Sequence, residues 1–457
     1  MKYFRFEKLL LKDGWISPAY LGVDDLGIVQ YLEAKVPTDG VAIEYVSGLA
    51  VPGFINGHSH AFQYAMAGHA EKHIFGVQDD FWSWREAMYR CALSMSPDEV
   101  ESVATMLYTE MLRNGYTHVA EFHYLHHNVD GRKYSNSAEM GERLVSAART
   151  AGIKITLIPI FYQKGNFGTD PYPQQRRFIS SDTDDYLQLL DDSARCVMQY
   201  DHARLGFGVH SLRAVSSEGV LRTFNEGPPG LPFHLHAAEQ LKEISDAEQF
   251  LKARPVQWLI DNMPLSNRFN IVHCTHMSDV EVNGLAASGA NVVLCPGTEG
   301  NLGDGIFRLT DYEKSRGSFC IGTDSHISLN PLEDLRWLDY AQRFTTHRRN
   351  TFDDGATAII RMIYESGRMA TGSFEEANYF SVGLPFDAVV YNSKMPLLTN
   401  ARAGDPLPSI VYSSDSSSVY GTIVNGRWIV KKEHHMNRES IMSKYRKAVK
   451  SIVGKTN

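Results

Sequence analysis

The chain has 457 residues, 43% hydrophobic and 21% charged, which is typical of a globular protein with one large domain or two smaller ones. Its formal net charge of -8 argues against nucleic acid or an anionic membrane as a partner. The amino-terminal residues lack signal-peptide character, no run approaches the roughly 18 apolar residues of a membrane span, and five scattered cysteines without C-x-x-C spacing indicate a reducing cytoplasm.

Short apolar runs set the organisation of the chain. Residues 1–49 are β-like, with turn signals at Lys12-Asp13-Gly14 and Asp24–Gly27. From residue 50 to about residue 375, β-like runs alternate with longer stretches of helical period. The eight runs are Ala50–Ile55, Thr117–Phe122, Lys154–Phe161, Leu205–Val209, Leu231–Leu235, Phe269–Val272, Asn291–Leu294 and Ser318–Gly322.

The segments between the runs carry helix signals. Ser96 suits an N-cap, Pro97 suits the first helical position, and Gly115 suits the end of that helix. Amphipathic patterns predict further helices over Ser135–Ala151, Thr183–Tyr200, Met277–Ser288 and Pro331–Arg348. Buried strands that alternate with helices imply a parallel sheet, so we expect a (β/α)8 barrel. A doubly wound open sheet competes, but no G-x-G-x-x-G or P-loop motif supports it.

Strand patterns return near the carboxyl end. Phe386–Tyr391 and Tyr420–Val430 read as strands, with Asn425-Gly426 as a hairpin turn. The tail Ser440–Val453 has the pattern of a basic amphipathic helix, which we expect to pack on the protein.

Polar residues follow the eight runs. In a barrel, the carboxyl ends of all strands meet at one mouth, where active sites are built. In chain order these residues are His58 and His60; Glu121, His123 and Tyr124; Tyr162; His210 and Arg213; His236 and Glu239; His273 and His276; Thr298, Glu299 and Asn301; and Asp324 and His326.

Four of these residues are candidate metal ligands. His58 and His60 are two positions apart on a strand, so both side chains can face one ion. His236 follows the fifth run, and Asp324 follows the eighth, which neighbours the first in a closed barrel. Imidazole and carboxylate ligands suit Zn2+, with Fe2+ and Mn2+ as alternatives. The competing interpretation is a set of mouth histidines that bind no ion.

The spacing of these residues resembles the amidohydrolase superfamily, specifically its mononuclear deaminase branch. That resemblance implies one divalent metal held by His58, His60, His236 and Asp324. Binuclear relatives commonly carry a lysine on the fourth strand, whereas this chain reads GFGVHS over residues 206–211. The resemblance also implies a small flanking β-sandwich with a C-terminal helix from residues 1–50 and 380–457, beside a barrel at 51–379. The segment Phe374–Pro385 departs from the linker that usually joins the barrel to the flanking part in this superfamily.

Three residues are the candidate catalytic groups. Asp324 is both a ligand and a first proton acceptor. Glu239 lies three residues after His236 and can shuttle a proton to a departing nitrogen, although it also suits the start of a helix. His273 can hydrogen-bond the attacking oxygen or the developing tetrahedral centre, and its alternative is a core histidine bonded to backbone.

More extended motifs narrow the substrate. GHSHAFQ-x-AMAGHAE, FWSWRE-x-MYR, VAEFHYLHH-x-x-DGR, HSLRAV, H-x-AEQ-x-KE, VHCTH, TE-x-NLGDGIF and GTDSH occur in order between residues 50 and 345. They resemble the formimidoylglutamate deiminase (N-formimino-L-glutamate iminohydrolase) family of histidine degradation. That resemblance implies conversion of N-formimino-L-glutamate and water to N-formyl-L-glutamate and ammonia. A relative acting on another amidine or aminated heterocycle is the alternative.

A dicarboxylate amidine needs donors for two anionic groups. Arg85 and Arg213 match the family motifs, and a guanidinium can bind a carboxylate with two parallel hydrogen bonds. Gln63, Tyr124 and His210 add donors. Salt-bridged or packing roles are the alternatives for these five residues. Tyr64 stands where we expect the family to have arginine, and neither Glu121 nor Glu299 receives a role.

The remaining expectations concern partners and loss of activity. We expect a small-molecule substrate, no nucleic acid and no membrane, and a homodimer is left open. A barrel that has lost catalysis and serves as a scaffold predicts the loss of a metal-ligand or catalytic residue. The chain retains all of them: His58, His60, His236, Glu239, His273 and Asp324.

Overall fold

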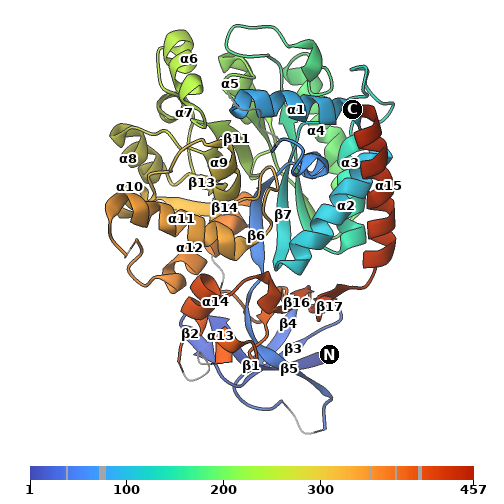
Figure 1. Ribbon diagram of the computed structural model, residues 1–457, viewed down its shortest axis with the longest axis vertical. Helices are drawn as coiled ribbons and strands as arrows, with labels where there is room; N and C mark the ends of the chain where they lie inside the picture. Colours follow the sequence, from blue (N-terminus) through green and yellow to red (C-terminus); the bar gives the residue numbers. More distant parts are fainter. Residues whose placement is uncertain (38–39, 72–78, 350, 376–377, 400–403, 457) are drawn as a thin grey trace.

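A parallel barrel forms the centre of the computed structural model, which describes residues 1–37, 40–71, 79–349, 351–375, 378–399 and 404–456 (Figure 1). The sheet order is β14-β13-β12-β11-β10-β8-β7-β6, with β9 (Ala203–Leu205) added beside β8. A parallel bridge between Ser59 and Asp324 joins the two end strands and nearly closes the barrel. Its strands are β6 (Phe54–Ser59), β7 (Tyr116–His123), β8 (Lys154–Phe161), β10 (Phe207–Ser211), β11 (Phe233–Ala237), β12 (Phe269–His273), β13 (Asn291–Leu294) and β14 (Ser318–Ile321).

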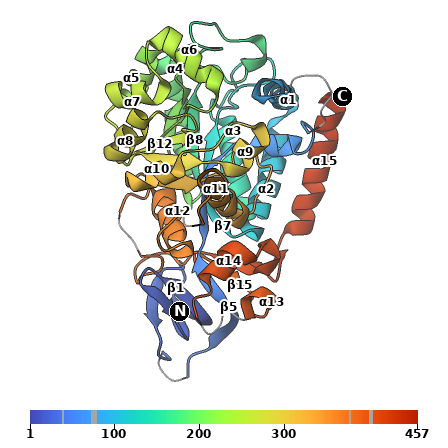
Figure 2. The same cartoon turned by 60° about the vertical axis from the view of Figure 1, so that its left-hand side comes forward.

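Helices surround this barrel in the described residues (Figures 1 and 2). The hydroxyl of Ser96 accepts a hydrogen bond from Glu99 N and caps the second helix, as predicted. Buried apolar faces, such as that of Leu144, Ala147 and Ala148, pack the helices onto the sheet. The helices are α1 (Phe81–Ser94), α2 (Pro97–Arg113), α3 (Glu139–Ala151), α4 (Thr183–Val197), α5 (Ser217–Glu226), α6 (Leu241–Leu251), α7 (Pro255–Asn262), α8 (Asp279–Ser288), α9 (Pro296–Leu302), α10 (Leu309–Lys314), α11 (Pro331–Thr346) and α12 (Ala356–Ala370).

Two of the eight predicted runs divide at glycine. The run Ala50–Ile55 belongs to two strands, because β5 (Ile43–Pro52) pairs with the flanking sheet and β6 begins at Phe54. A Cβ at Gly53 would lie 2.3 Å from Thr117 Cγ2, so the break requires glycine. The run Leu205–Val209 likewise divides at Gly206 into β9 and β10. The residues that follow the seventh run, from Pro296 to Leu302, form helix α9.

Both ends of the chain build a second, mixed sheet beside the barrel. Its order is β18-β17-β16-β15-β5-β1-β3-β4, and β2 pairs with β1. Asn425 and Gly426 both have positive φ, 46° and 68°, and form the predicted hairpin turn between β16 and β17. The strands are β1 (Lys2–Leu11), β2 (Gly14–Ile16), β3 (Ala19–Val23), β4 (Val29–Glu33), β5 (Ile43–Pro52), β15 (Ala388–Tyr391), β16 (Val419–Val424), β17 (Arg427–Lys431) and β18 (His434–His435).

These features confirm the predicted barrel with a small flanking β-structure from both chain ends. The predicted boundaries at residues 50 and 380 stay a prediction. Two short helices, α13 (Pro396–Thr399) and α14 (Leu407–Ser413), lie near the flanking sheet (Figure 1).

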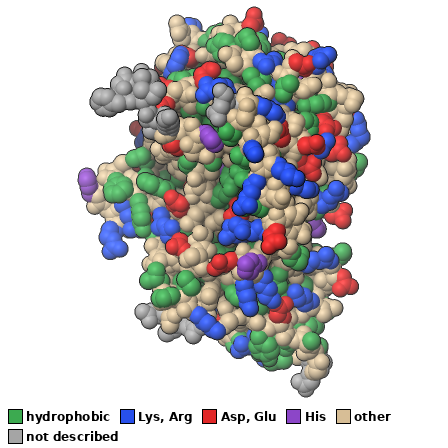
Figure 3. All heavy atoms as spheres, turned by 45° about the vertical axis from the view of Figure 1, so that its right-hand side comes forward, with side chains coloured by type: hydrophobic (Ala, Val, Ile, Leu, Met, Phe, Trp, Pro, Cys, Tyr) green, Lys and Arg blue, Asp and Glu red, His purple; other side chains and the backbone are tan. Residues whose placement is uncertain are grey.

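The C-terminal helix α15 (Arg438–Thr456) packs along α2 and returns to the barrel (Figure 2). Lys455 Nζ lies 2.8 Å from Glu99 Oε1 and fixes the end of α15 against the start of α2. Acidic and basic side chains are interspersed on the face that Figure 3 shows. Within the described ranges, no helix has the length and apolar character needed to cross a membrane.

Candidate active site and metal centre

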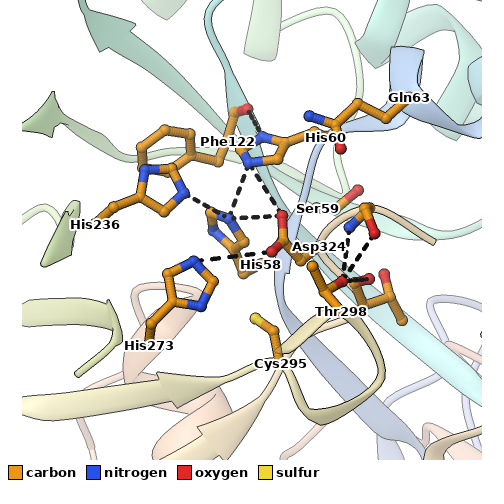
Figure 4. A network of polar contacts seen from close by, with 12 residues as sticks. His58, Ser59, His60, Gln63, Phe122, His236, His273, Cys295, Thr298 and Asp324 are labelled. Carbon is orange, nitrogen blue, oxygen red and sulfur yellow. Dashed lines mark hydrogen bonds and ion pairs between the residues drawn. The ribbon is translucent and has the colours of Figure 1, made fainter. Parts of the chain in front are cut away.

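The predicted strand-end residues meet at one end of the barrel. His58 is on β6 and His60 follows it, His236 is on β11, His273 ends β12, and Asp324 follows β14. Figure 4 shows these five side chains directed toward one another. All are buried, with at most 6% exposure. Parallel strands bring residues that are far apart in sequence to the same end of a barrel, as expected.

Three histidines present nitrogen atoms to one point. His58 Nε2 lies 3.1 Å from His60 Nε2 and 3.1 Å from His236 Nε2. The Nδ1 of His60 donates to the Phe122 carbonyl (2.9 Å), and the Nδ1 of His236 donates to the His210 carbonyl (3.0 Å). Since carbonyls only accept, both rings carry their proton on Nδ1 and direct a lone pair from Nε2. His58 Nε2 carries at most one proton and can donate it to only one of these two rings. The other close nitrogen–nitrogen contact therefore brings two lone pairs together.

The charge state of these rings agrees with this geometry. Burial and the neighbouring His60 lower the pKa of His58 to about 3. Burial also lowers the pKa values of His60 and His236. The rings are therefore neutral, and neutral imidazole is the form that binds a metal.

Asp324 adds a carboxylate to the three rings. Its Oδ1 lies 3.3 Å from His60 Nε2 and 3.6 Å from His58 Nε2. Burial would raise the pKa of Asp324, but the adjacent imidazoles, His58 foremost, outweigh it and hold that pKa well below its usual range. The Asp324 backbone has φ 48°, a strained conformation for a non-glycine residue, and its N–H donates to His58 O (3.0 Å).

This donor set fits a divalent metal. The lone pairs of His60 and His236 and the Asp324 carboxylate converge on His58 Nε2, which can donate at most one proton to them, so the buried set is unfavourable unless a cation lies among them. The backbone carbonyls that hold the two Nδ1–H groups orient the rings as ligands. Among the described residues a second group, His273, Cys295 and Asp324, also has ligand atoms within 4.8 Å. It shares Asp324, and burial raises the pKa of the Cys295 thiol well above its ordinary value, so we favour the first group.

Glu239 and His273 form a second cluster beside the ligands. His273 Nε2 lies 3.7 Å from Glu239 Oε1 and 3.8 Å from Asp324 Oδ2, while its Nδ1 lies 3.3 Å from Glu299 Oε1. Burial opposes a positive charge on His273, but the three carboxylates outweigh it and raise its pKa to about 10. Burial raises the pKa of Glu239, against the attraction of His273 and Arg213. Glu299, which the sequence left without a role, thus orients His273.

Arg213 lies next to Glu239 rather than free in the cavity. Its Nη2 is 3.6 Å from Glu239 Oε2, and its Nη1 is 3.7 Å from Glu243 Oε2. Both distances are too long for hydrogen bonds, and Nη1 is a buried donor with no partner in the structure. Glu243 also accepts hydrogen bonds from the backbone N–H groups of Ala238 (3.2 Å) and Glu239 (3.0 Å).

The sequence analysis did not identify Glu243, although it is the last residue of the H-x-AEQ-x-KE motif. Its spacing from His236 was the available signal. Only the turn between β11 and α6 brings the Glu243 carboxylate close to both the Glu239 backbone N–H and the Arg213 guanidinium.

The five predicted substrate-binding residues line one cavity beside the metal ligands. Gln63 Nε2 donates to the Tyr124 hydroxyl at 3.0 Å, while Gln63 Oε1 and Arg85 Nε are buried without a partner. Side chains of α1 line part of this space, a cavity of about 40 Å3. The lining comprises Gln63, Arg85, Tyr124, His210 and Arg213, the aromatic and apolar Phe81, Trp84, Met88, Tyr89, Tyr162, Phe178 and Leu302, and the central His60, His236, Glu239, His273 and Asp324.

Other strand-end residues support the site or lie away from it. Glu121 accepts hydrogen bonds from the Ser59 hydroxyl and from Ala61 N (2.6 Å), so it holds the segment that carries His60. Burial raises the pKa of Glu121 to about 7. The Tyr64 ring packs on Tyr445 of α15, with centroids 5.8 Å apart, and Tyr64 is not among the cavity residues.

Comparison with known proteins gives results that agree with this geometry. The model of the amidohydrolase family matches residues 49–429. The chain is 40% identical over 440 residues to a formimidoylglutamate deiminase from Pseudomonas aeruginosa. The matched region covers 95% of this chain and 95% of that protein.

Two solved structures show the same fold. An amidohydrolase from Brucella melitensis has a TM-score of 0.92 and 36% identity, covering 99% of this chain and 100% of that one. An adenosine deaminase from Xanthomonas campestris with bound zinc has a TM-score of 0.81 and 17% identity, covering 99% of this chain and 98% of that one.

Proposed function

The chain belongs to the amidohydrolase family, and on this premise we propose that it hydrolyses N-formimino-L-glutamate to N-formyl-L-glutamate and ammonia. It is a hydrolase that acts on carbon–nitrogen bonds, and its relative from Pseudomonas aeruginosa is a formimidoylglutamate deiminase. Water adds to the formimino carbon, the terminal nitrogen leaves as ammonia, and the carbon becomes the formyl group. The reaction belongs to histidine degradation.

The observation that supports this substrate is the pair of guanidinium groups at the cavity. Arg85 Nε and Arg213 Nη1 are buried donors without partners, and both side chains line the space beside the metal ligands. A buried unpaired donor is costly, so a ligand that pairs both is favoured. N-formimino-L-glutamate carries two carboxylates, whereas adenine and guanine rings carry none.

We propose one zinc ion per subunit, held by His58, His60, His236 and Asp324. Fe2+ and Mn2+ suit the same ligands. When bound, the ion supplies a Lewis acid that lowers the pKa of water toward neutrality. The neutral imidazoles and the bound zinc of the Xanthomonas campestris structure support this assignment.

The proton-transfer roles follow from the positions of three side chains. Asp324 accepts the first proton from the attacking water. Glu239, beside His273 and Arg213, carries a proton to the departing nitrogen, which leaves as ammonia. His273, held through Nδ1 by Glu299, directs Nε2 toward the tetrahedral carbon and stabilises its oxygen.

Arg85 and Arg213 bind the two carboxylates in this proposal, with Gln63, Tyr124 and His210 as further donors. Ligand pockets occupy about 300–1,000 Å3, so the cavity of about 40 Å3 must widen to admit substrate. The side chains of α1 and Leu302 line it, and in this proposal they are the groups that move.

Release of ammonia tests the proposal. Metal-loaded protein is mixed with N-formimino-L-glutamate, guanine or adenosine, and ammonia is measured over time. We expect turnover of N-formimino-L-glutamate and none of the two purines. Turnover of a purine with none of N-formimino-L-glutamate would establish the alternative, a deaminase of an aminated heterocycle. No turnover of N-formimino-L-glutamate overturns the proposal.

We further propose that the protein acts in the cytoplasm on a small molecule, without nucleic acid or membrane partners, and that it can form a homodimer. Its net charge of -8 and its five buried free cysteines are consistent with the first part. Size-exclusion chromatography with light scattering tests the dimer.

A further inference from the structure

A second, larger cavity lies at the opposite end of the barrel from the metal ligands. Its volume is about 610 Å3, within the usual range for small-molecule pockets. Thr117 and His118 at the start of β7 and Lys154 at the start of β8 line it. The residues that follow α12 and the start of β15 complete the wall, so the cavity lies between the barrel and the flanking sheet.

Two arginines face this cavity without a carboxylate partner. Among the described residues, neither Arg204 nor Arg368 forms an ion pair with an aspartate or glutamate. Arg204 donates to the hydroxyl of Ser373, and Arg368 Nη2 donates to the backbone carbonyl of Glu375 at 3.4 Å. These neutral partners fix the guanidinium groups but do not neutralise them.

The two arginines also repel each other. Partial desolvation at the cavity wall and the charge of Arg368 lower the pKa of Arg204 from its ordinary value, against the attraction of Asp387, and its guanidinium stays charged at neutral pH. An anion bound between the two guanidinium groups would relieve this repulsion.

The wall also carries three carboxylates, and among the described residues none of them forms an ion pair with either arginine. Lys154 pairs with Asp387. Asp201 and Glu375 are exposed. The buried His118 is bonded to Thr156 Oγ1 (3.0 Å), and burial with the three nearby cations lowers the pKa of His118 well below its ordinary value, so it stays neutral.

Apolar side chains supply the rest of the wall. Tyr364 and Tyr379 pack edge to face with centroids 5.0 Å apart, and Ile55 and Phe374 extend this surface. A wall of aromatic groups beside two guanidinium groups suits an organic anion better than a bare inorganic ion.

We propose that this cavity binds a small organic anion, with Arg204 and Arg368 holding its carboxylate or phosphate group and the tyrosines packing on its apolar part. The site is separate from the metal centre, so the proposal does not depend on the reaction assigned above. Carboxylates and phosphates share this chemistry, and the probes distinguish them.

Isothermal titration calorimetry tests the proposal on the full-length protein with AMP, citrate and inorganic phosphate. We expect AMP or citrate to bind the wild type and to bind the Arg204→Met/Arg368→Met variant at least tenfold more weakly. AMP without citrate identifies a phosphate ligand, and citrate without AMP identifies a carboxylate ligand. Arg361→Met, an exposed arginine on the same helix as Arg368, is the matched control and should bind as the wild type does.

Arg213→Met separates this cavity from the active site, and it should leave the titration unchanged. The single variant Arg204→Met, at an exposed position, gives a weaker loss if the double variant does not fold. The proposal is overturned if neither organic anion binds the wild type at millimolar concentration. It is equally overturned if the two arginine substitutions leave binding unaltered.

Discussion

Glu243→Gln is the substitution that best separates positioning from chemistry at this site. The Glu243 carboxylate accepts two backbone N–H groups, from Ala238 and Glu239, and faces Arg213 at 3.7 Å. Glutamine keeps the shape but has one acceptor oxygen. It therefore leaves one N–H without its partner and turns an NH2 group toward a cation.

The expected cost follows from these contacts. Hydrogen bonds to a charged group contribute about 1.5–3 kcal/mol, against about 0.5–1.5 kcal/mol for neutral pairs. One weakened bond and one unpaired donor together destabilise the fold by about 2–4 kcal/mol. At about 2.1 cal/mol/K of unfolding entropy per residue, a chain of 457 residues loses only about 2–4 °C in Tm. The variant therefore stays folded and its kinetics can be measured.

The kinetic effect should be larger than the effect on Tm. Glu243 fixes the turn that carries Glu239 and attracts the guanidinium of Arg213 from 3.7 Å. Displacing one charge-assisted contact to a substrate carboxylate costs about 1.5–3 kcal/mol, which corresponds to a loss of about 10- to 150-fold in kcat/KM. Ammonia release measures this loss, and Glu248→Gln is the control because Glu248 lies exposed on the same helix.

A double-variant cycle decides whether Glu243 acts through Arg213. The effects of Glu243→Gln and Arg213→Met on kcat/KM should be strongly non-additive, whereas a purely structural role gives additive effects. A folded Glu243→Gln protein with wild-type kcat/KM would refute the reasoning.

Three further substitutions test the site. Arg213→Met should raise KM and lower kcat/KM by about 10- to 150-fold through a lost carboxylate contact, and an unchanged kcat/KM in the ammonia assay contradicts that role. The Glu239→Gln variant should keep its metal, as measured by elemental analysis, while its kcat falls by about 10²- to 10⁴-fold. An empty metal site in this variant would instead show that Glu239 supports metal binding rather than proton transfer. Gly322→Ala places a Cβ 2.7 Å from His58 Cβ. The substitution should therefore lower the free energy of unfolding by about 1–3 kcal/mol and reduce the metal content. A wild-type Tm with wild-type metal content would show instead that the end of β14 relaxes freely.

The sequence by itself determined the periodicity of the barrel and the residue types at its mouth. Alternating buried runs and capped helices require only local information, so six of the predicted runs correspond to single strands and Ser96 caps α2. His58 and His60 were identifiable because side chains two apart on a strand share a face. The two runs that divide contain Gly53 and Gly206, where a Cβ would meet Thr117 of β7 or Ile158 of β8, contacts that the local sequence does not reveal.

The tertiary structure decided which groups meet and in which charge state. No spacing shows that His60 and His236 donate Nδ1–H to backbone carbonyls and thereby direct lone pairs at His58. The link from Glu299 to His273 and that from Glu243 to Arg213 join side chains on different strands and loops. Such links depend on the register and closure of the barrel, because burial and distance, not residue type, set the interaction of two polar groups.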